Sequence, residues 1–278
     1  MRKGLTDMKY AISNIAWQKE MTDQVFSLLQ EYSISGIEIA PSRVWEHTDK
    51  ISYTQVVKYR RKVAKWGLEI VGFHSLFYDH PGLGLFKEKD VEKKTKDFLK
   101  HLITVCADCG GKTLIFGSPK ARKRGDLPLD RAIEIAADFF IEVAEKAKEK
   151  KVFLCIEPLG PDETDFIDSA CSALQLIKKV NHPYFQGHLD AKSLYASREI
   201  SYQTFQNFAP FLKHFHVNEP ELKPISISKQ IDHCLIGKYL RKIGYSGYVS
   251  IEQRSVDTMD TLGVIKKSIM EMKKCYAN

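Results

Sequence analysis

Four side chains whose types could bind a divalent cation sit at or near the ends of short apolar runs. They are Glu157, Asp190, His216 and Glu252. Burying carboxylates close together costs several kcal/mol unless a cation or another partner balances their charge. Three carboxylates with an imidazole suit Mn²⁺, Co²⁺, Mg²⁺ or Zn²⁺. We therefore expect these four residues to hold one divalent metal ion (Mn, Co, Mg or Zn).

Each of these residues also has a purely structural interpretation. Glu157 could cap the loop that follows it, and Asp190 could cap the N-terminus of a helix. His216 could be a satisfied histidine of the core. His214 lies on the same strand face as His216, so a structural role one layer deeper is favoured for it. The joint pattern, in which strand after strand ends in a polar residue, favours the metal site.

The elements that must position these residues are short apolar runs that alternate with longer amphipathic segments. The runs are Tyr10–Ile15, Gly36–Ala40, Glu69–His74, Thr113–Phe116, Val152–Glu157, Phe185–Asp190, His214–Val217 and Tyr248–Glu252. The helical segments are Glu20–Tyr32, Ser52–Trp66, Val91–Cys109, Arg131–Lys150, Asp168–Val180, Tyr202–Phe208, Ile231–Ile243 and Asp257–Lys274. This strict alternation predicts an α/β fold, a single (β/α)₈ TIM barrel with its functional groups at the C-terminal ends of the strands.

Length and composition agree with one barrel. The chain has 278 residues, of which 28% are charged and 44% hydrophobic. No linker rich in Pro, Gly or Ser divides it, so one domain over residues 1–278 is expected, with residues 1–8 as a flexible N-terminal extension. The apolar runs are too short for a membrane helix, which needs about 20 residues. No secretory signal is evident, so a cytoplasmic protein is expected.

The six cysteines are scattered, and a chain of this length does not need disulfides to fold. Reduced cysteines are therefore expected. Cys106 and Cys109 form a C-x-x-C pattern late in a helical segment, without the second pair that a zinc site requires, so a structural role is favoured.

The net charge of +7 is spread mainly over helix faces, but one dense basic run covers residues 120–124. Lys120 and Arg122 in this run are candidates for binding an anionic group of a substrate. Aromatic residues are not interleaved with the run, so nucleic acid is disfavoured as a partner.

Several motifs together resemble the xylose isomerase-like barrels, in particular the sugar phosphate isomerase/epimerase group with its tagatose 3-epimerase-like enzymes and hydroxypyruvate isomerase. The motifs are Gly36-Ile37-Glu38-Ile39-Ala40, Gly72-Phe73-His74, Ile156-Glu157-Pro158-Leu159, Glu163-Thr164-Asp165-Phe166, Leu189-Asp190, His214-Phe215-His216-Val217-Asn218-Glu219 and the stretch from Gly244 to Glu252. The resemblance spans about Tyr10 to Met272. It implies a metal at the four residues named above, with Glu157 and Glu252 also serving as the catalytic acid–base pair.

The same resemblance implies that Glu163 binds substrate and that Glu38 and His74 lie near it. For Glu38, a role in holding the barrel together is the open alternative. His188 and Arg254 join the substrate-binding candidates because they lie at strand ends. His233 is a further candidate, with an ordinary surface-loop histidine as the alternative.

The chain departs from the epimerase pattern at several positions. Ser193 stands where a histidine is usual, Leu222 where an arginine is usual, and Gly160-Pro161-Asp162 precedes the substrate glutamate. A free ketohexose is therefore a weaker expectation than a derivative. The extra histidines of the related endonuclease IV, which binds three metals, are absent at Gly117 and Ser193, which disfavours DNA repair.

The function expected from these observations is a metal-dependent isomerase or epimerase of a sugar, sugar phosphate or sugar acid. Proton transfer would pass through an enediolate that the metal stabilises. A metal-dependent dehydratase or lyase acting on a polyol or keto acid shares the first proton abstraction and stays open. A non-catalytic sugar-binding protein is the third interpretation. The resemblance also allows a homo-oligomer, by analogy alone.

Overall fold

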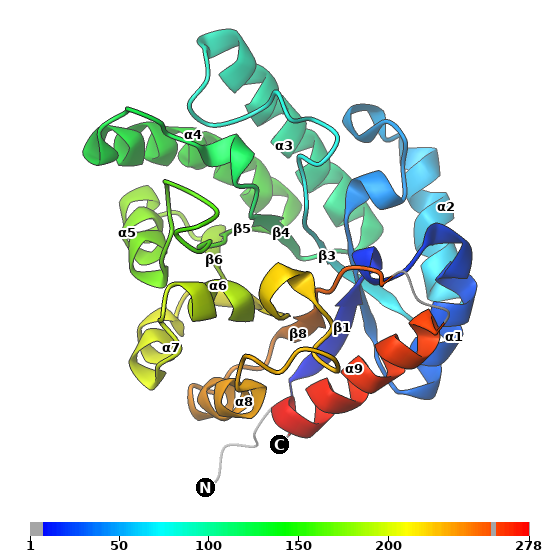
Figure 1. Ribbon diagram of the computed structural model, residues 1–278. Helices are drawn as coiled ribbons and strands as arrows, with labels where there is room; N and C mark the ends of the chain where they lie inside the picture. Colours follow the sequence, from blue (N-terminus) through cyan, green and yellow to red (C-terminus); the bar gives the residue numbers. More distant parts are fainter. Residues whose placement is uncertain (1–7, 257–259, 278) are drawn as a thin grey trace, which may run out of the picture.

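The fold is a closed barrel of eight parallel strands in the order β1 to β8. The computed structural model describes residues 8–256 and 260–277. Figure 1 looks along the barrel and shows the helices as an outer ring in chain order. The predicted (β/α)₈ TIM barrel is confirmed.

The strands lie within one or two residues of their predicted ends. They are β1 (Lys9–Ser13), β2 (Gly36–Ile39), β3 (Glu69–Phe73), β4 (Thr113–Phe116), β5 (Phe153–Ile156), β6 (Phe185–Asp190), β7 (Leu212–Val217) and β8 (Tyr248–Ile251). The helices are α1 (Thr22–Glu31), α2 (Tyr53–Ala64), α3 (Lys89–Cys109), α4 (Leu129–Lys150), α5 (Ala170–Val180), α6 (Ala191–Ala196), α7 (Tyr202–Phe208), α8 (His233–Lys242) and α9 (Thr261–Tyr276). Of these, only α6 has no counterpart in the sequence prediction.

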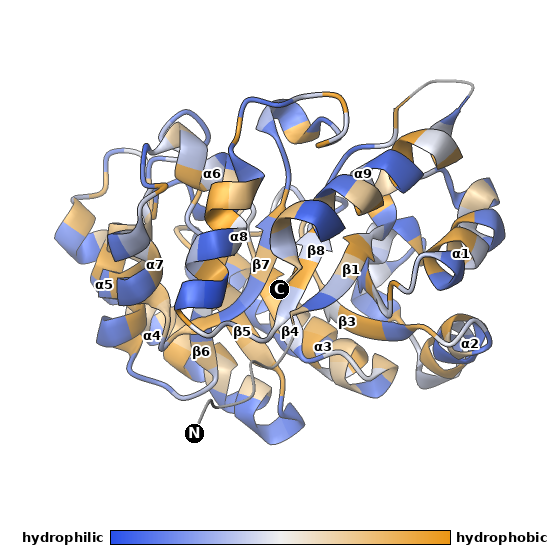
Figure 2. Cartoon of the chain, turned by 90° about the horizontal axis from the view of Figure 1, so that it is seen from below, coloured by the Kyte–Doolittle hydropathy of each residue, from blue (hydrophilic) through white to orange (hydrophobic). Residues whose placement is uncertain are grey.

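Local signals explain where several helices begin and end. Ser52 caps α2 through a reciprocal capping box with Gln55, and Ser169 does the same for α5 with Ser172. Gly110 ends α3 with a φ of 94°, a left-handed conformation that favours glycine. Each long helix turns an apolar stripe toward the strands, and Figure 2 shows the hydrophobic residues concentrated there.

Residues 1–7 of the expected N-terminal extension lie outside the described residues, whereas Met8 is buried and packs into the core. The predicted start of the last helix at Asp257 also lies outside the described residues. No helix in the described part of the chain is long and apolar enough to cross a membrane.

The cysteines differ in part from the expectation. Cys234 of α8 and Cys275 of α9 form a disulfide, so the prediction that all cysteines are reduced is wrong in this structure. Gly237 makes the pairing feasible, because a Cβ there would meet the carbonyl oxygen of Cys275 at 2.1 Å. Cys106 and Cys109 are free and buried, and burial raises the pKa of the Cys109 thiol to about 12. A reactive thiolate is therefore disfavoured at this pair.

The barrel interior changes character toward the C-terminal ends of the strands. A polar layer replaces the aliphatic core there, formed by Ser13, Glu38, His74, His188, Asp190, His214, His216 and Ser250, all of them buried. The strand register makes these side chains neighbours, because Asp190 pairs with His216 and His216 pairs with Ser250. Because buried polar groups need partners, this layer is the candidate for a binding or catalytic site.

Candidate active and metal site

Four buried side chains from three neighbouring strands bring metal-binding atoms together. Glu157, His188, Asp190 and His216 each offer one ligand atom, and these atoms lie within 4.8 Å of one another. Glu157 directly follows β5, and the other three belong to β6 and β7. Three of the four predicted ligands therefore meet, and His188 joins them as a further candidate ligand.

Glu252, the fourth predicted ligand, lies beside this group. Its Oε2 is 3.4 Å from Nδ1 of His216, and its Oε1 is 3.0 Å from Nδ1 of His74. The amide nitrogen of Asn218 donates to Asp190 Oδ2 at 2.5 Å and to Glu252 Oε2 at 3.0 Å. One amide group thus bridges the two carboxylates and holds Glu252 in the site.

Asp190 serves two of the roles considered from the sequence. Its Oδ1 accepts a hydrogen bond from the backbone N–H of Ser193 at 2.8 Å and so caps α6. Its Oδ2 faces the cluster, 3.8 Å from Nδ1 of His216. Capping and metal binding use different oxygen atoms of the same carboxylate, so the two interpretations are compatible.

His216 is held from below by a second group of buried residues. Its Nε2 lies 2.8 Å from Oε2 of Glu38, which also accepts from Ser250 Oγ at 2.8 Å. His214 Nε2 is 3.2 Å from the other Glu38 oxygen. A proton on Nε2 leaves the Nδ1 lone pair of His216 facing Asp190 and Glu252, which is the orientation a metal-ligating imidazole needs. Glu38 and His214 are thus placed beneath the site, as the architectural alternative for Glu38 predicts.

The carboxylates of the cluster differ in how the protein stabilises their charge. Burial and the neighbouring Asp190 and Glu252 raise the pKa of Glu157 well above its usual value. Burial also raises the pKa of Asp190, with Glu252 adding to it against an opposing effect of Lys192. Burial would lower the pKa of His216, but Glu38 and Glu252 outweigh it and raise that pKa well above normal. These three shifts reduce negative charge in the cluster, as a bound cation would also do. Burial would raise the pKa of Glu252 as well, but His216 and His74 outweigh burial and lower that pKa well below its usual value.

His188 fits the same interpretation. Neither ring nitrogen has a hydrogen-bond partner within the described residues, although the side chain is fully buried. Burial, followed by the nearby His216 and His214, lowers its pKa well below normal, so the ring is neutral. Neutral imidazole and carboxylate oxygen are the donors that Mn²⁺, Co²⁺ and Zn²⁺ accept. The donor set of the cluster therefore fits a divalent ion.

A cavity of about 480 Å³ opens over the cluster. Glu157, Glu252 and His74 line its inner end. Its walls carry Ser75, Tyr78, His80, Lys120, Glu163, Lys192 and Arg254, among others. Of the predicted substrate-binding residues, the structure brings His74, Lys120, Glu163 and Arg254 to this cavity. His188 and Glu38 lie beneath it.

Lys192 is a cavity residue that sequence reasoning does not identify. It pairs with Glu163 through a short contact between Nζ and Oε1. Burial would lower its pKa, but Asp190, Glu163 and Glu157 raise it above normal, so the ammonium group stays charged. The available signal is its position two residues after Asp190, because residues just beyond strand ends face the mouth of a barrel.

Arg122 does not reach the cavity, in contrast to the prediction. Its side chain is fully buried and donates from Nη1 to the carbonyl oxygen of Glu157 at 2.6 Å. A second, short hydrogen bond goes to the carbonyl oxygen of Phe116. Its neighbour Arg124 is likewise occupied, donating to backbone oxygens that include that of Asp165 at 2.9 Å. Arg122 thus fixes the backbone that carries Glu157, and Lys120 is left as the member of the basic run that lines the cavity.

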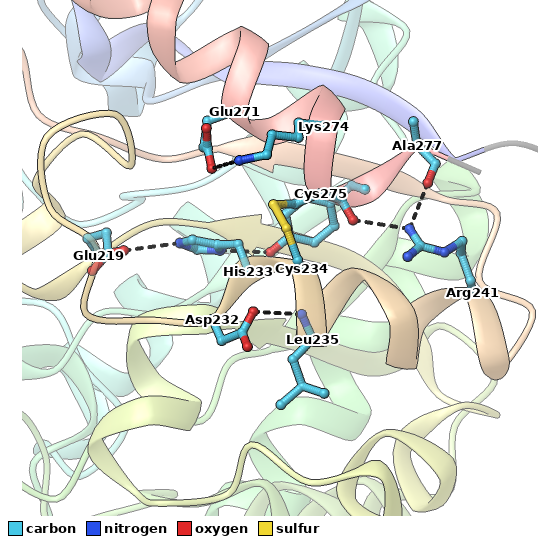
Figure 3. Close-up of a disulfide and its surroundings, with 11 residues drawn as sticks. Glu219, Asp232, His233, Cys234, Leu235, Arg241, Glu271, Lys274, Cys275 and Ala277 are labelled. Atoms are coloured by element: carbon cyan, nitrogen blue, oxygen red, sulfur yellow. Dashed lines mark hydrogen bonds and ion pairs between the residues drawn. A yellow bond between two sulfur atoms is a disulfide. The ribbon is translucent and has the colours of Figure 1, made fainter.

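His233 is also placed away from the cavity. Its Nδ1 is 2.9 Å from the hydroxyl of Tyr276, and its Nε2 is 3.4 Å from Oε1 of Glu219. Figure 3 shows this ring at the start of α8, next to the disulfide of Cys234 and Cys275. The candidate role of His233 in substrate binding is therefore not supported, and neither is the surface-loop alternative, because the residue is buried.

Gly117 and Asn218 are two further residues that the site requires. A Cβ on Gly117 would lie 1.7 Å from Oε2 of Glu157, so only glycine leaves room for that carboxylate. Asn218 also accepts from the backbone N–H of Lys192 at 2.9 Å and so links α6 to the end of β7. Gly117 directly follows β4 and Asn218 directly follows β7. This position at the end of a barrel strand is the sequence signal that could identify both residues.

Comparison with solved structures shows the same barrel in several proteins of known structure. D-psicose 3-epimerase from Clostridium cellulolyticum H10, solved with D-tagatose, superposes with a TM-score of 0.81 at 18% identity, covering 97% of this chain and 99% of that one. The 3-keto-D-glucoside 4-epimerase YcjR from E. coli gives 0.79 at 17% identity, covering 97% and 100%. The IOLI protein with a bound zinc atom gives 0.75 at 15%, covering 96% and 99%.

Comparison of sequences gives a narrower result. No curated protein matches the chain significantly. The family model described as xylose isomerase-like TIM barrel matches residues 26–275. This match covers most of the chain and includes every residue of the buried cluster. The chain therefore belongs to the xylose isomerase-like TIM-barrel family.

Proposed function

We propose that the chain is a divalent-metal-dependent isomerase or epimerase that acts on a sugar or sugar derivative. One observation carries the proposal. Two carboxylates, Glu157 and Glu252, line the inner end of one cavity, and Glu157 belongs to a buried group of four potential metal ligands whose donor atoms lie within 4.8 Å of one another. Two carboxylates beside a cation are suited to moving a proton from one position of a carbon skeleton to another.

The solved structures with the same barrel support this assignment. Those named above include two sugar epimerases and a protein with bound zinc. Their low identity to this chain makes the likeness one of fold, so the assignment rests on the residues of this chain's own site.

We propose that Glu157, Asp190, His216 and Glu252 hold the ion, and that His188 is an alternative to Glu252 as the fourth ligand. The ion, when bound, would act as a Lewis acid that makes the hydrogen next to a substrate carbonyl more acidic. Glu38 would keep His216 in the ligating tautomer through the contact at its Nε2.

The remaining roles fall to side chains of the cavity. One of Glu157 and Glu252 removes a proton from carbon, and the other returns a proton at the product position. His74 orients Glu252 through the 3.0 Å contact at Oε1, and is itself held by Ser13 at 2.5 Å. Arg122 fixes the backbone carbonyl of Glu157. Lys120 and Arg254, which also line the cavity, are suited to a phosphate or carboxylate on the substrate.

The proposal is tested by proton exchange in D₂O. Purified protein supplied with Mn²⁺, Co²⁺, Mg²⁺ or Zn²⁺ is incubated with a panel of ketoses, ketose phosphates and sugar acids, and deuterium at carbon is followed by NMR. We expect incorporation next to the carbonyl with at least one member. Glu157→Gln should reduce it by about a hundredfold or more. Glu134→Gln, which changes an exposed glutamate of α4 paired with Arg131, should leave it unchanged.

Two outcomes would overturn the proposal. One is the absence of exchange with every substrate and metal in a protein that is shown to be folded. The other is exchange that continues unchanged in Glu157→Gln. Loss of a hydroxyl group from the substrate, detected in the same spectra, would identify a dehydratase or lyase instead.

A further inference from the structure

A second cavity, of about 360 Å³, lies between helix α2 and the segments that follow β1 and β2. Its lining comes from the segments that follow β1 and β2, from the start of α1 and from one face of α2. It has no lining residue in common with the cavity over the metal cluster. Figure 1 shows α1 and α2 as neighbours on one side of the barrel, with β6, which carries His188 and Asp190, on the other.

The inner wall of this second cavity is aromatic. Trp17, Trp45 and Tyr59 line it, and the two tryptophans are 2% and 6% exposed. Trp45 and Tyr59 meet edge to face, with ring centroids 5.5 Å apart. Aromatic walls of this kind bind planar rings by stacking and edge contacts.

The rim of the same cavity is cationic. Lys19, Arg43, Lys58 and Lys62 line it, and no acidic residue does. Only Lys62 has a carboxylate partner in the described chain, Asp23 of α1 at 2.9 Å. Exposed lysines are common and mean little singly, but four cations at the mouth of one aromatic pocket set up a field that attracts anions.

Arg43 supplies the sharpest feature of the rim. Its Nη2 donates to the carbonyl oxygen of Trp17 at 2.5 Å, which fixes the guanidinium group against the aromatic wall. Its Nε is buried and has no hydrogen-bond partner in the described part of the chain. A buried N–H without a partner is unfavourable. An anion that enters the cavity would meet this half-buried guanidinium group.

The positive charge continues along α2, away from the cavity. From Tyr53 to Ala64 the helix contains no acidic residue. Lys58 and Lys62 also line a shallower neighbouring cavity together with Arg61 and Lys65. The positive charge therefore extends over several side chains of α2, on a surface that borders the aromatic cavity.

From these observations we infer that the cavity between β1, β2 and α2 is a second ligand site, separate from the metal cluster. It binds a small molecule that joins a planar aromatic ring to a phosphate or carboxylate, the chemistry shared by nucleoside monophosphates and aromatic acids. The ring packs against Trp17, Trp45 and Tyr59, while the anion meets Arg43, Lys19 and Lys58. Neither half of such a ligand alone would engage both parts of the site.

Intrinsic fluorescence provides a direct assay, because two of the chain's three tryptophans, Trp17 and Trp45, line the cavity. The full chain is titrated with a nucleoside monophosphate, an aromatic carboxylate, the uncharged nucleoside and inorganic phosphate, with calorimetry in parallel. We expect one of the first two to bind at least tenfold more tightly than the uncharged nucleoside and inorganic phosphate. The member that binds identifies which anion the site prefers.

Matched charge variants locate the binding. Lys19→Gln with Lys58→Gln removes two exposed cations that have no carboxylate partner, so folding is not at risk. Lys178→Gln with Lys179→Gln removes the same charge from α5, outside every cavity described. We expect the first pair to weaken binding about tenfold or more and the second pair to change it less than twofold. Neither pair should alter exchange at the metal cluster.

Three results would overturn the inference. One is the absence of binding by all four probes to a folded protein. Another is equal weakening by both variant pairs, which would show only a general charge effect. The third is tighter binding of an oligonucleotide duplex that a mononucleotide does not displace, which would make the basic face of α2 a nucleic-acid surface instead.

Discussion

Two buried groups in this barrel each combine histidine and carboxylate side chains, but they differ in how the charge of the carboxylates is stabilised. In the first, Glu219 accepts hydrogen bonds from Ser228 and from the backbone of Gln230 and Ile231, and it faces His233, which in turn meets Tyr276. One carboxylate therefore has several donors and one imidazole. In the candidate metal site, the three carboxylates of Glu157, Asp190 and Glu252 lie around His216 and share the donors Asn218, Ser193 and His74.

The pKa shifts follow this difference. Burial would raise the pKa of Glu219, but its contacts with His233, Ser228 and Gln230 outweigh burial and lower it. Burial raises the pKa values of Glu157 and Asp190, whereas for Glu252 the contacts with His216 and His74 outweigh burial and lower the pKa. Donors around Glu219 stabilise its charge, whereas buried carboxylates that raise one another's pKa are typical of a functional site. The comparison teaches that the charge balance of a buried polar group, more than its composition, marks a functional site.

The largest effect that the comparison predicts is on Glu157. Glu157→Gln should reduce the exchange rate by about a hundredfold or more, because a positioned acid or base contributes about 10²–10⁴ in rate. In metal-free protein the same substitution should raise the free energy of unfolding by about 1 kcal/mol, because it removes one of the repelling carboxylates. Denaturant unfolding in a chelator measures this. Destabilisation of the metal-free variant would mean that the cluster is already balanced.

Gly117→Ala should give the next largest effect. The added Cβ would overlap Oε2 of Glu157, so the carboxylate must move. Since a shift of about 1 Å at a reacting group costs up to about a hundredfold in rate, we expect a fall of about tenfold to a hundredfold. Gly125→Ala in the adjoining loop is a control for glycine substitution, because a Cβ there meets nothing within 4 Å, although its φ of 59° adds some strain. Equal rates in Gly117→Ala and the parent would contradict the placement of Glu157.

The group of Glu219 and His233 should respond in stability and not in chemistry. His233→Gln removes the contact to Glu219 and changes the contact to Tyr276, so we expect a loss of about 1–3 kcal/mol in the free energy of unfolding. Metal content should stay within error of the parent. Thermal denaturation and elemental analysis measure the two quantities on one sample. Loss of metal from His233→Gln would contradict the prediction that the Glu219–His233 group contributes to stability alone.

The smallest effect concerns pH. The lowered pKa of Glu219 means that its contribution to stability is complete above its unfolded value of about 4.3 and is lost as pH falls through the lower folded value. The difference in unfolding free energy between the parent and Glu219→Gln should therefore be constant above about pH 5.5 and should shrink below about pH 4. Guanidinium titrations across this range measure it. A difference that grows toward low pH would contradict the sign of the shift.

The sequence predicts the fold and much of the site because both follow local patterns. Apolar runs mark the strands, and the polar residues that end them must gather at one mouth once the barrel closes. Glu157, Asp190 and Glu252 are identified in this way, and their proximity in the structure is what the pattern predicts. Their roles as ligands and catalysts stay predictions.

Other features depend on packing that no local pattern records. Arg122 lies in a basic run that is typical of an exposed loop, and its burial follows from two carbonyl groups that accept from it. The pairing of Cys234 with Cys275 depends on how closely α8 packs on α9, since the two lie 41 residues apart. The short helix α6 begins directly after Asp190, so its N-cap residue is also the predicted ligand.

Elemental analysis of the purified chain, combined with metal titration, tests the central claim most directly. We expect close to one divalent ion per chain in the parent and in Glu219→Gln, and much less in Asp190→Asn and His216→Asn. A parent protein that binds no Mn²⁺, Co²⁺, Mg²⁺ or Zn²⁺, or an Asp190→Asn/His216→Asn double variant that retains a full complement, would contradict it.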